Sequence, residues 1–167
     1  MLFETERLYI RRLQLADEAR FYDLKSNPNV VNPLPRKPLT ADESKAELRS
    51  LIFLESSSGK KVWCICEKGS AELIGCCGIM ANDAGQPEIG YQLREAFWGK
   101  GYGTEIAKAL IDYGFDVLKL ELITADVAAE NSRSVKILEK FFTLEKEFFN
   151  ATDQCTDRRY YLKRENR

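Results

Sequence analysis

The chain has 167 residues, of which 44% are hydrophobic and 31% charged, and its formal net charge is −1. These values are typical of a soluble globular protein, and the length suits a single domain, residues 1–167, with a core of its own. A net charge this close to zero gives no general attraction to nucleic acid or to an anionic membrane. We therefore expect neither as a partner.

The sequence shows no targeting or membrane signal. Its first residues lack the basic region and apolar run of a signal peptide. No apolar stretch approaches the roughly 20 residues that are needed to span a bilayer. The expected location is therefore the cytoplasm.

Five cysteines and the absence of histidine limit the possible chemistry. The cysteines stand at positions 64, 66, 76, 77 and 155, so the chain contains no Cys-x-x-Cys pair. Without histidine there is no His-dependent zinc site, no Ser-His-Asp triad and no Cys-His pair. We expect reduced, mostly buried thiols that pack as small hydrophobic groups, and no bound metal.

The first part of the chain predicts one strand and two helices separated by a proline-rich loop. Residues 8–13 alternate as a strand does, and residues 17–25 have a helical apolar pattern. Residues 27–38 hold four of the five prolines, which predicts an irregular loop. A capping box, Thr40-Ala41-Asp42-Glu43, then predicts a helix that continues to Leu54 and ends near residues 56–59.

Strands come next, followed by alternating helices and strands. A short turn at residues 68–70 makes the first two of these strands antiparallel neighbours. In chain order the predicted elements are strands at 62–67, 73–80 and 88–93, a helix at 104–117, a strand at 120–125, a helix at 132–142, and strands at 144–150 and 158–163. The pattern contains no repeat and no linker, so it predicts one α+β domain.

Three glycines alternate with larger residues directly before the predicted helix at 104–117, in the sequence Gly99-Lys100-Gly101-Tyr102-Gly103. Glycine lets backbone N–H groups approach a ligand without interference from a Cβ atom. The first four N–H groups of a helix have no internal partner, and the helix dipole adds about half a positive charge there. Together these features predict a site for an anion such as a pyrophosphate.

Other interpretations of this glycine-rich turn can be compared on spacing. A tight turn that binds nothing remains open, because a glycine cluster alone is weakly specific. A P-loop would need Gly-x-x-x-x-Gly-Lys followed by Ser or Thr, which is absent. A Rossmann fingerprint needs Gly-x-Gly-x-x-Gly in a parallel βαβ unit, whereas here the third glycine comes one residue early and the preceding strands are predicted to be antiparallel.

A more specific signal is the order of three segments, Glu88-Ile89-Gly90-Tyr91-Gln92-Leu93, Gly99-Lys100-Gly101-Tyr102-Gly103-Thr104-Glu105 and Glu130-Asn131-Ser132-Arg133-Ser134. Together they resemble the GNAT superfamily of N-acetyltransferases. More narrowly, they resemble its RimJ/RimL-type branch, whose founding members acetylate the N-termini of ribosomal proteins. The likeness extends over nearly the whole chain.

The resemblance implies an α+β fold with a mixed, mostly antiparallel twisted sheet, flanked by about four helices and splayed between the strands near 88–93 and 120–125. Acetyl-CoA would be the co-substrate, with no metal. Its pantetheine arm would bond like an added strand to the backbone of Tyr91, Gln92 and Leu93. Asn131 would bond the arm from the opposite side and also cap its own helix. The pyrophosphate would rest on the amides of Gly99, Lys100, Gly101, Tyr102, Gly103 and Thr104.

Amine acetylation needs a neutral amine and a proton for the departing thiolate. With histidine absent, carboxylates and tyrosines remain as candidates. The resemblance points to Glu88 as the base, with Asp126 as the alternative, although each could equally be a solvated carboxylate at a strand end. Many relatives use a tyrosine seven residues after the asparagine as the acid, but this chain has Leu138 there. RimL-type relatives instead carry a serine, here Ser134, which could reach the thiolate or simply bond the backbone.

The identity of the acceptor stays open between a peptide N-terminus, a free amino acid, a polyamine and an antibiotic amine. An α-amine has a pKa of about 7.7–8.0 and a lysine amine one of about 10.4, so the α-amine needs only a weak base. Two other classes remain, namely a catalytically silent acyl-CoA-binding module, suggested by Leu138, and an NAD-dependent oxidoreductase, which the glycine spacing disfavours. The protein could be a monomer or a homodimer.

Overall fold

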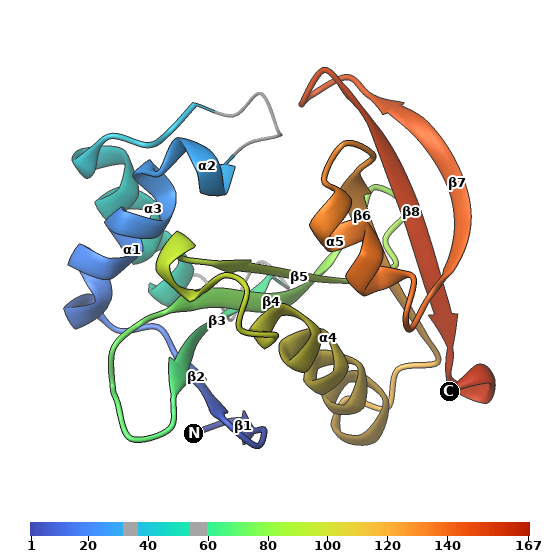
Figure 1. Ribbon diagram of the computed structural model, residues 1–167, viewed down its shortest axis with the longest axis horizontal. Coiled ribbons are helices and arrows are strands. Elements are labelled where there is room, and N and C mark those ends of the chain that lie inside the picture. Colours follow the sequence, from blue (N-terminus) through green and yellow to red (C-terminus); the bar gives the residue numbers. More distant parts are fainter. Residues whose placement is uncertain (32–36, 54–59) are drawn as a thin grey trace.

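The computed structural model describes residues 1–31, 37–53 and 60–167. In this part of the chain, eight strands form one sheet in the order β1-β2-β3-β4-β5-β6-β8-β7 (Figure 1). Neighbouring strands are antiparallel except for β5 and β6, which run parallel. In chain order the strands are β1 (Phe3–Glu4), β2 (Leu8–Arg12), β3 (Lys61–Glu67), β4 (Gly75–Ala81), β5 (Pro87–Leu93), β6 (Leu122–Ala128), β7 (Thr143–Asn150) and β8 (Cys155–Lys163).

Helices cover both faces of the sheet (Figure 1). The described helices are α1 (Glu18–Ser26), α2 (Pro28–Val31), α3 (Ala41–Phe53), α4 (Tyr102–Asp112) and α5 (Ser132–Leu138), with 3-10 turns at Leu15–Asp17, Glu95–Phe97 and Arg164–Asn166. α1 and α3 lie on one face, while α4 lies on the other, below β4 and β5 in the view of Figure 1. The predicted α+β fold with a mostly antiparallel sheet is confirmed, with about five helices instead of four.

Alternate residues of β3 enter two separate cores, as the two-residue period of a strand requires. Trp63 and Ile65 pack in the core that includes the α4 residues, and Cys64 and Cys66 pack in the core beneath α1 and α3. The four cysteines of β3 and β4 are buried free thiols, in agreement with the prediction that they pack as small hydrophobic groups.

The sheet opens between β5 and β6, at the predicted place. These two parallel strands pair at one position, Glu88 with Thr124, and the Thr124 hydroxyl donates to the Pro87 carbonyl at 2.9 Å. After this point β5 keeps its partner β4 on one side, and β6 keeps β8 on the other. The facing edges therefore diverge into a wedge.

Two of the predicted helices differ from the structure at their C-terminal ends. The helix expected at 104–117 is α4 followed by a π-helical turn, Tyr113–Val117, which the Leu118 amide closes by donating to the Tyr113 carbonyl at 3.0 Å. Gly114, in this turn, lies close to β6, because a Cβ atom there would lie 2.7 Å from Ile123 Cδ1. The helix expected at 132–142 ends at Leu138, four residues early, because the amides of Lys140 and Phe141 donate three residues back, in tight turns that lead into β7 at Thr143.

Two predictions near the proline-rich segment have different outcomes. The capping box is confirmed, because the Glu43 amide donates to Thr40 Oγ1 at 3.3 Å and the Thr40 amide donates to the Glu43 carboxylate at 2.8 Å. The irregular loop predicted for 27–38 is wrong at Pro28–Val31, which form α2, since proline is well suited to the first position of a helix. Residues 32–36, and the predicted helix end near 56–59, lie outside the described residues.

The predicted strand at 120–125 is displaced, because β6 runs from Leu122 to Ala128. The Leu120 amide donates back to the Gly114 carbonyl at 3.0 Å, so residue 120 still belongs to the connection after the π-helical turn. Among the described helices, none combines the length and the apolar character that would be needed to cross a membrane.

Truncation of Leu110 tests the packing of α4 against the sheet. Leu110 is fully buried, so L110A should lower the free energy of unfolding by about 2–5 kcal/mol. Val117, which is 59% exposed, provides the control, and V117A should change that free energy by less than about 0.5 kcal/mol. Urea unfolding monitored by circular dichroism measures both values. Equal losses in the two variants would contradict the described packing of α4.

Candidate active site

A cavity of about 1020 Å³ occupies the wedge between β5 and β6. One end is formed by the glycine-rich turn and the start of α4, and the middle by the inner edges of β5, β6 and α5. Residues of the β4–β5 turn and of the β7–β8 connection close the other end. A space of this size lies at the upper end of the range for ligand and cofactor sites.

The glycine-rich turn presents a run of free backbone donors. Gly99 and Gly101 have φ angles of +74° and +81°, which glycine adopts readily. Within the described part of the chain, the amides of residues 99–104 donate to no acceptor. Successive N–H groups in such a turn form a concave anion site, and the positive end of the α4 dipole lies at the same place. The predicted anion cradle therefore has the required free donors.

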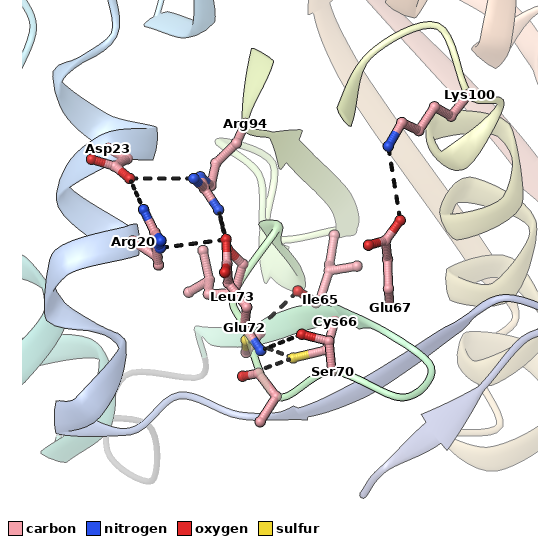
Figure 2. Close-up of polar contacts among 12 residues, drawn as sticks. Arg20, Asp23, Ile65, Cys66, Glu67, Ser70, Glu72, Leu73, Arg94 and Lys100 are labelled. Carbon is pink, nitrogen blue, oxygen red and sulfur yellow. Dashed lines mark hydrogen bonds and ion pairs between the residues drawn. The ribbon is translucent and has the colours of Figure 1, made fainter. Parts of the chain in front are cut away.

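The start of this turn is anchored on both sides. Trp98 Nε1 donates to the Leu93 carbonyl at 2.8 Å, which ties the turn to the end of β5. Arg94, directly after β5, reaches Asp23 of α1 and Glu72 of the β3–β4 connection (Figure 2). The distances are 3.3 Å to Asp23 and 2.5 Å to Glu72. These contacts hold the end of β5 in place at the mouth of the cavity.

Tyr91 projects from β5 into the region between α4 and α5. A Cβ atom on Gly103 of α4 would lie 3.7 Å from its ring, and its hydroxyl is buried without a hydrogen-bond partner among the described residues. Burial raises the pKa of Tyr91 to about 12, and the nearby Ser134 hydroxyl has the opposite, smaller effect on this pKa. The two hydroxyl groups do not have the geometry of a hydrogen bond. A buried hydroxyl without a partner is costly, so this atom suits a ligand contact.

α5 begins on the opposite side of the wedge. Asn131 is its N-cap, and its Oδ1 accepts from the Ser134 amide at 3.3 Å, as expected for an N-cap. Ser134 is half-buried in the first turn of α5 and lines the cavity. Leu138, at the position where many relatives carry a tyrosine, is 3% exposed and also lines the cavity.

Five carboxylates line the far end of the cavity, and we refer to them as the acidic end: Asp83, Glu88, Asp126, Asp153 and Asp157. Arg159, which is almost fully buried, contacts two of them. It donates to both oxygens of Asp126 at 2.8 and 2.7 Å and to Asp83 at 2.5 Å. These pairs engage Asp126 in two directed bonds and Asp83 in one.

Glu88 differs from its neighbours in its ionisation. Burial, followed by the negative charge of Asp126, raises the pKa of Glu88 to about 7, while Arg159 acts in the opposite direction. A carboxyl group with this pKa is half-ionised near neutral pH and can accept and release a proton there. Asp126 is bound by Arg159 instead, so the two candidate bases are in different environments.

The structure brings nearly all of the predicted site residues to one cavity. Those that line it are Glu88, Tyr91, Gln92, Leu93, Gly99, Gly101, Tyr102, Gly103, Thr104, Asp126, Asn131 and Ser134. The Gln92 side chain points to the α1 side, where Lys25 donates to it at 3.2 Å. The Lys100 side chain points out of the cavity and towards Glu67 (Figure 2), with 4.0 Å between its amine and the Glu67 carboxylate.

Sequence reasoning missed Arg159 and most of the acidic end. The sequence assigns no role to Asp83, Asp153 or Asp157, and none of them belongs to a recognisable motif. No short-range signal could have found them, because about 70 residues separate Asp83 from Asp153 along the chain. Within the described residues, no group of three or more His, Cys, Asp or Glu side chains could hold a metal ion.

Comparison with known proteins shows which family has a similar sequence. The sequence model of the Acetyltransferase (GNAT) domain matches residues 7–141. The chain is 36% identical to the uncharacterized N-acetyltransferase p20 of Bacillus licheniformis over 137 residues, which are 80% of this chain and 77% of that protein.

Two solved structures have the same fold. One is the RimL ribosomal α-N-protein acetyltransferase in complex with coenzyme A, with a TM-score of 0.81, 18% identity and 97% of each chain covered. The other is the spermidine N-acetyltransferase of Vibrio cholerae in complex with CoA and spermine. It has a TM-score of 0.79 and 22% identity, with 95% of this chain and 96% of that chain covered.

The coupling between Glu88 and Asp126 can be tested on the free protein. D126N removes a negative charge and releases Arg159, so the pKa of Glu88 should fall from about 7 towards 4.5. A ¹³C NMR titration of the glutamate carboxyl groups measures this pKa. E145Q, on the exposed outer strand β7, is the control and should leave it unchanged. A value that stays near 7 in D126N would show that Asp126 does not contribute.

Proposed function

The chain belongs to the GNAT acetyltransferase family, and on this premise we propose that it moves the acetyl group of acetyl-CoA to a primary amine by direct attack, without an acyl-enzyme. The observation that carries this proposal is the run of six free amides, residues 99–104, next to the unpaired edge of β5. A wedge with these donors suits an extended ligand with an anionic group at one end.

We propose that the pyrophosphate of acetyl-CoA binds the amides of Gly99, Lys100, Gly101, Tyr102, Gly103 and Thr104. The pantetheine arm would pair with the free edge of β5 at Tyr91, Gln92 and Leu93. The Asn131 amide group would bond it from the α5 side, since its Nδ2 donates to no acceptor among the described residues. The buried Tyr91 hydroxyl supports this fit, because it lines the same cavity and has no described partner.

We propose Glu88 as the general base. Its pKa of about 7 lets it take the proton of the attacking amine near neutral pH, whereas both oxygens of Asp126 are engaged by Arg159. The amine nitrogen then attacks the thioester carbonyl, the carbon–sulfur bond breaks, and the thiolate leaves. Ser134, in the first turn of α5, is the proposed proton donor to this thiolate, since Leu138 has no proton to give, and Ser134 regains its proton from solvent as Glu88 releases the amine proton to solvent.

Two acceptor classes are supported by different observations. A peptide α-amine, as in the RimJ/RimL-type branch, suits a base as weak as Glu88, because its own pKa is only about 7.7–8.0. A small polycationic amine is the second candidate, and the acidic end of the cavity favours it, because several carboxylates attract a second positive charge. Proteins of this fold act on both classes, as the RimL and spermidine enzymes illustrate.

Calorimetric titration of the purified protein with acetyl-CoA, and with NAD as the control ligand, tests the proposed cofactor. We expect micromolar binding of acetyl-CoA and no binding of NAD.

A panel of acceptors, from peptides with free N-termini to spermidine, is then screened for acetylation by mass spectrometry. Binding of acetyl-CoA without turnover on any amine would favour a catalytically silent module. Absence of binding would contradict the proposed function.

The pH dependence of kcat/KM tests Glu88 as the base. An acceptor whose amine pKa is well above 7 arrives as the ammonium ion, so Glu88 must be ionised to take its proton. The logarithm of kcat/KM should therefore rise with a slope of one below about pH 7 and level off above it. In E88Q the change of slope near pH 7 should disappear, and kcat/KM at pH 8 should fall about 10²- to 10⁴-fold.

The control for E88Q is E145Q, which should keep the wild-type profile. Acetyl-CoA affinity is measured for both variants by calorimetry to confirm that the cavity is intact. If E88Q retains the change of slope near pH 7, Glu88 is not the base and another group must provide this titration.

A further inference from the structure

Arg7, directly before β2, reaches across to the glycine-rich turn and to the first turn of α4. Its Nη1 donates to the Lys100 carbonyl at 2.8 Å. Its Nε donates to the Glu105 carboxylate at 2.8 Å, and its Nη2 lies 2.6 Å from the same carboxylate. The guanidinium also lies over the Tyr102 ring, 4.6 Å from its centroid. One side chain thus contacts three residues of the turn and helix start.

Glu105 is itself held in place, which fixes the guanidinium that it binds. Its Oε1 accepts from Thr5 Oγ1 at 2.5 Å and from the Arg7 amide at 3.0 Å. Burial raises the pKa of Glu105, but the hydrogen bonds from Thr5 and Arg7 outweigh this effect and hold the pKa below its ordinary value. The carboxylate is therefore charged at neutral pH, and its bonds to Arg7 are charge-assisted.

The bond from Arg7 to the Lys100 carbonyl sets the direction of the next amide. The C=O of residue 100 and the N–H of residue 101 belong to one planar trans peptide, in which they point in opposite directions. Because Arg7 holds the carbonyl on its own side, the Gly101 N–H points away from Arg7. Arg7 also packs on this glycine, since a Cβ atom there would lie 3.4 Å from Nη2. Gly101 itself lines the cavity.

The Lys100 side chain points away from the cavity. Its amine lies 4.0 Å from Glu67, as Figure 2 shows, and 4.8 Å from the centroid of the Phe97 ring. Lys100 is not among the residues that line the cavity. The glycine-rich turn therefore contributes backbone groups to the cavity wall. The orientation of these backbone groups decides which ligand the turn can bind.

We propose that Arg7 is a positioning residue for acetyl-CoA, which orients the Lys100–Gly101 peptide so that its N–H is presented to the pyrophosphate. This proposal rests on the proposed function of the glycine-rich turn. Arg7 acts through the backbone and is not required to touch the cofactor. Its side chain is 46% exposed, so its ion pair adds little to stability and its replacement should leave the protein folded.

The test compares two acetyl donors in the wild type and in R7M. Acetyl-CoA carries the pyrophosphate, and S-acetylpantetheine has the same reactive thioester without any phosphate. We expect R7M to lower kcat/KM for acetyl-CoA by about 10- to 100-fold, mainly through KM, because charge-assisted hydrogen bonds are lost. For S-acetylpantetheine, kcat/KM should stay within about twofold of the wild type. A general structural role of Arg7 would lower both values together.

Three further variants separate orientation from charge. R7K keeps the positive charge but lacks the planar fork that reaches Lys100 and Glu105 together, so it should lose about as much as R7M. E105Q should produce a smaller loss of the same kind, because it weakens the hold on the guanidinium. R12M, at the other end of β2, removes an exposed arginine of the same strand and should match the wild type.

The outcomes distinguish this proposal from the one on which it rests. If the wild type prefers acetyl-CoA strongly and R7M keeps that preference, Arg7 does not position the cradle, and the proposed function is unaffected. Near-wild-type kinetics of R7K would assign the effect to charge alone and would also overturn the proposal. If the wild type itself uses both donors equally well, the pyrophosphate cradle is wrong, and the role of Arg7 falls with it.

Discussion

The site depends on a sheet in which two parallel neighbours, β5 and β6, pair at one position only, Glu88 with Thr124. Beyond that position each strand keeps its outer partner, so the inner edges separate and leave backbone groups of β5 unpaired. An unpaired strand edge is normally a liability that proteins cover. Here it adjoins the free amides of residues 99–104, so one ligand with acceptors along its length could satisfy both.

The cavity has ends of opposite polarity. Backbone donors and the positive end of the α4 dipole lie at the glycine-rich turn, and the carboxylates of the acidic end lie at the opposite side. An anionic cofactor and a cationic amine would therefore be attracted to different ends and meet in the middle. Glu88 lies where the wedge begins, and the burial that raises its pKa follows from the same geometry that opens the sheet.

The features that could be predicted from the sequence are those encoded by local patterns. Strand alternation located β3 to β5, the Thr40 capping box located α3, and the order of three motifs located the cavity. Predictions failed where tertiary contacts decide the backbone, as at Leu120, whose amide donates back to the Gly114 carbonyl so that β6 begins only at Leu122. Likewise, no local signal connects Arg7 to Lys100 or Arg159 to Asp83, because these contacts exist only after the chain has folded.

The central claim is that the free amides of residues 99–104 are the anion-binding part of the site. The most direct measurement is a ¹H–¹⁵N NMR titration of the labelled protein with acetyl-CoA, in which the glycine amides form a recognisable group. The account predicts that the amides of Gly99, Gly101 and Gly103 shift most strongly and saturate together with those of Tyr91 to Leu93. Saturable binding that leaves the amides of residues 99–104 unchanged would contradict it.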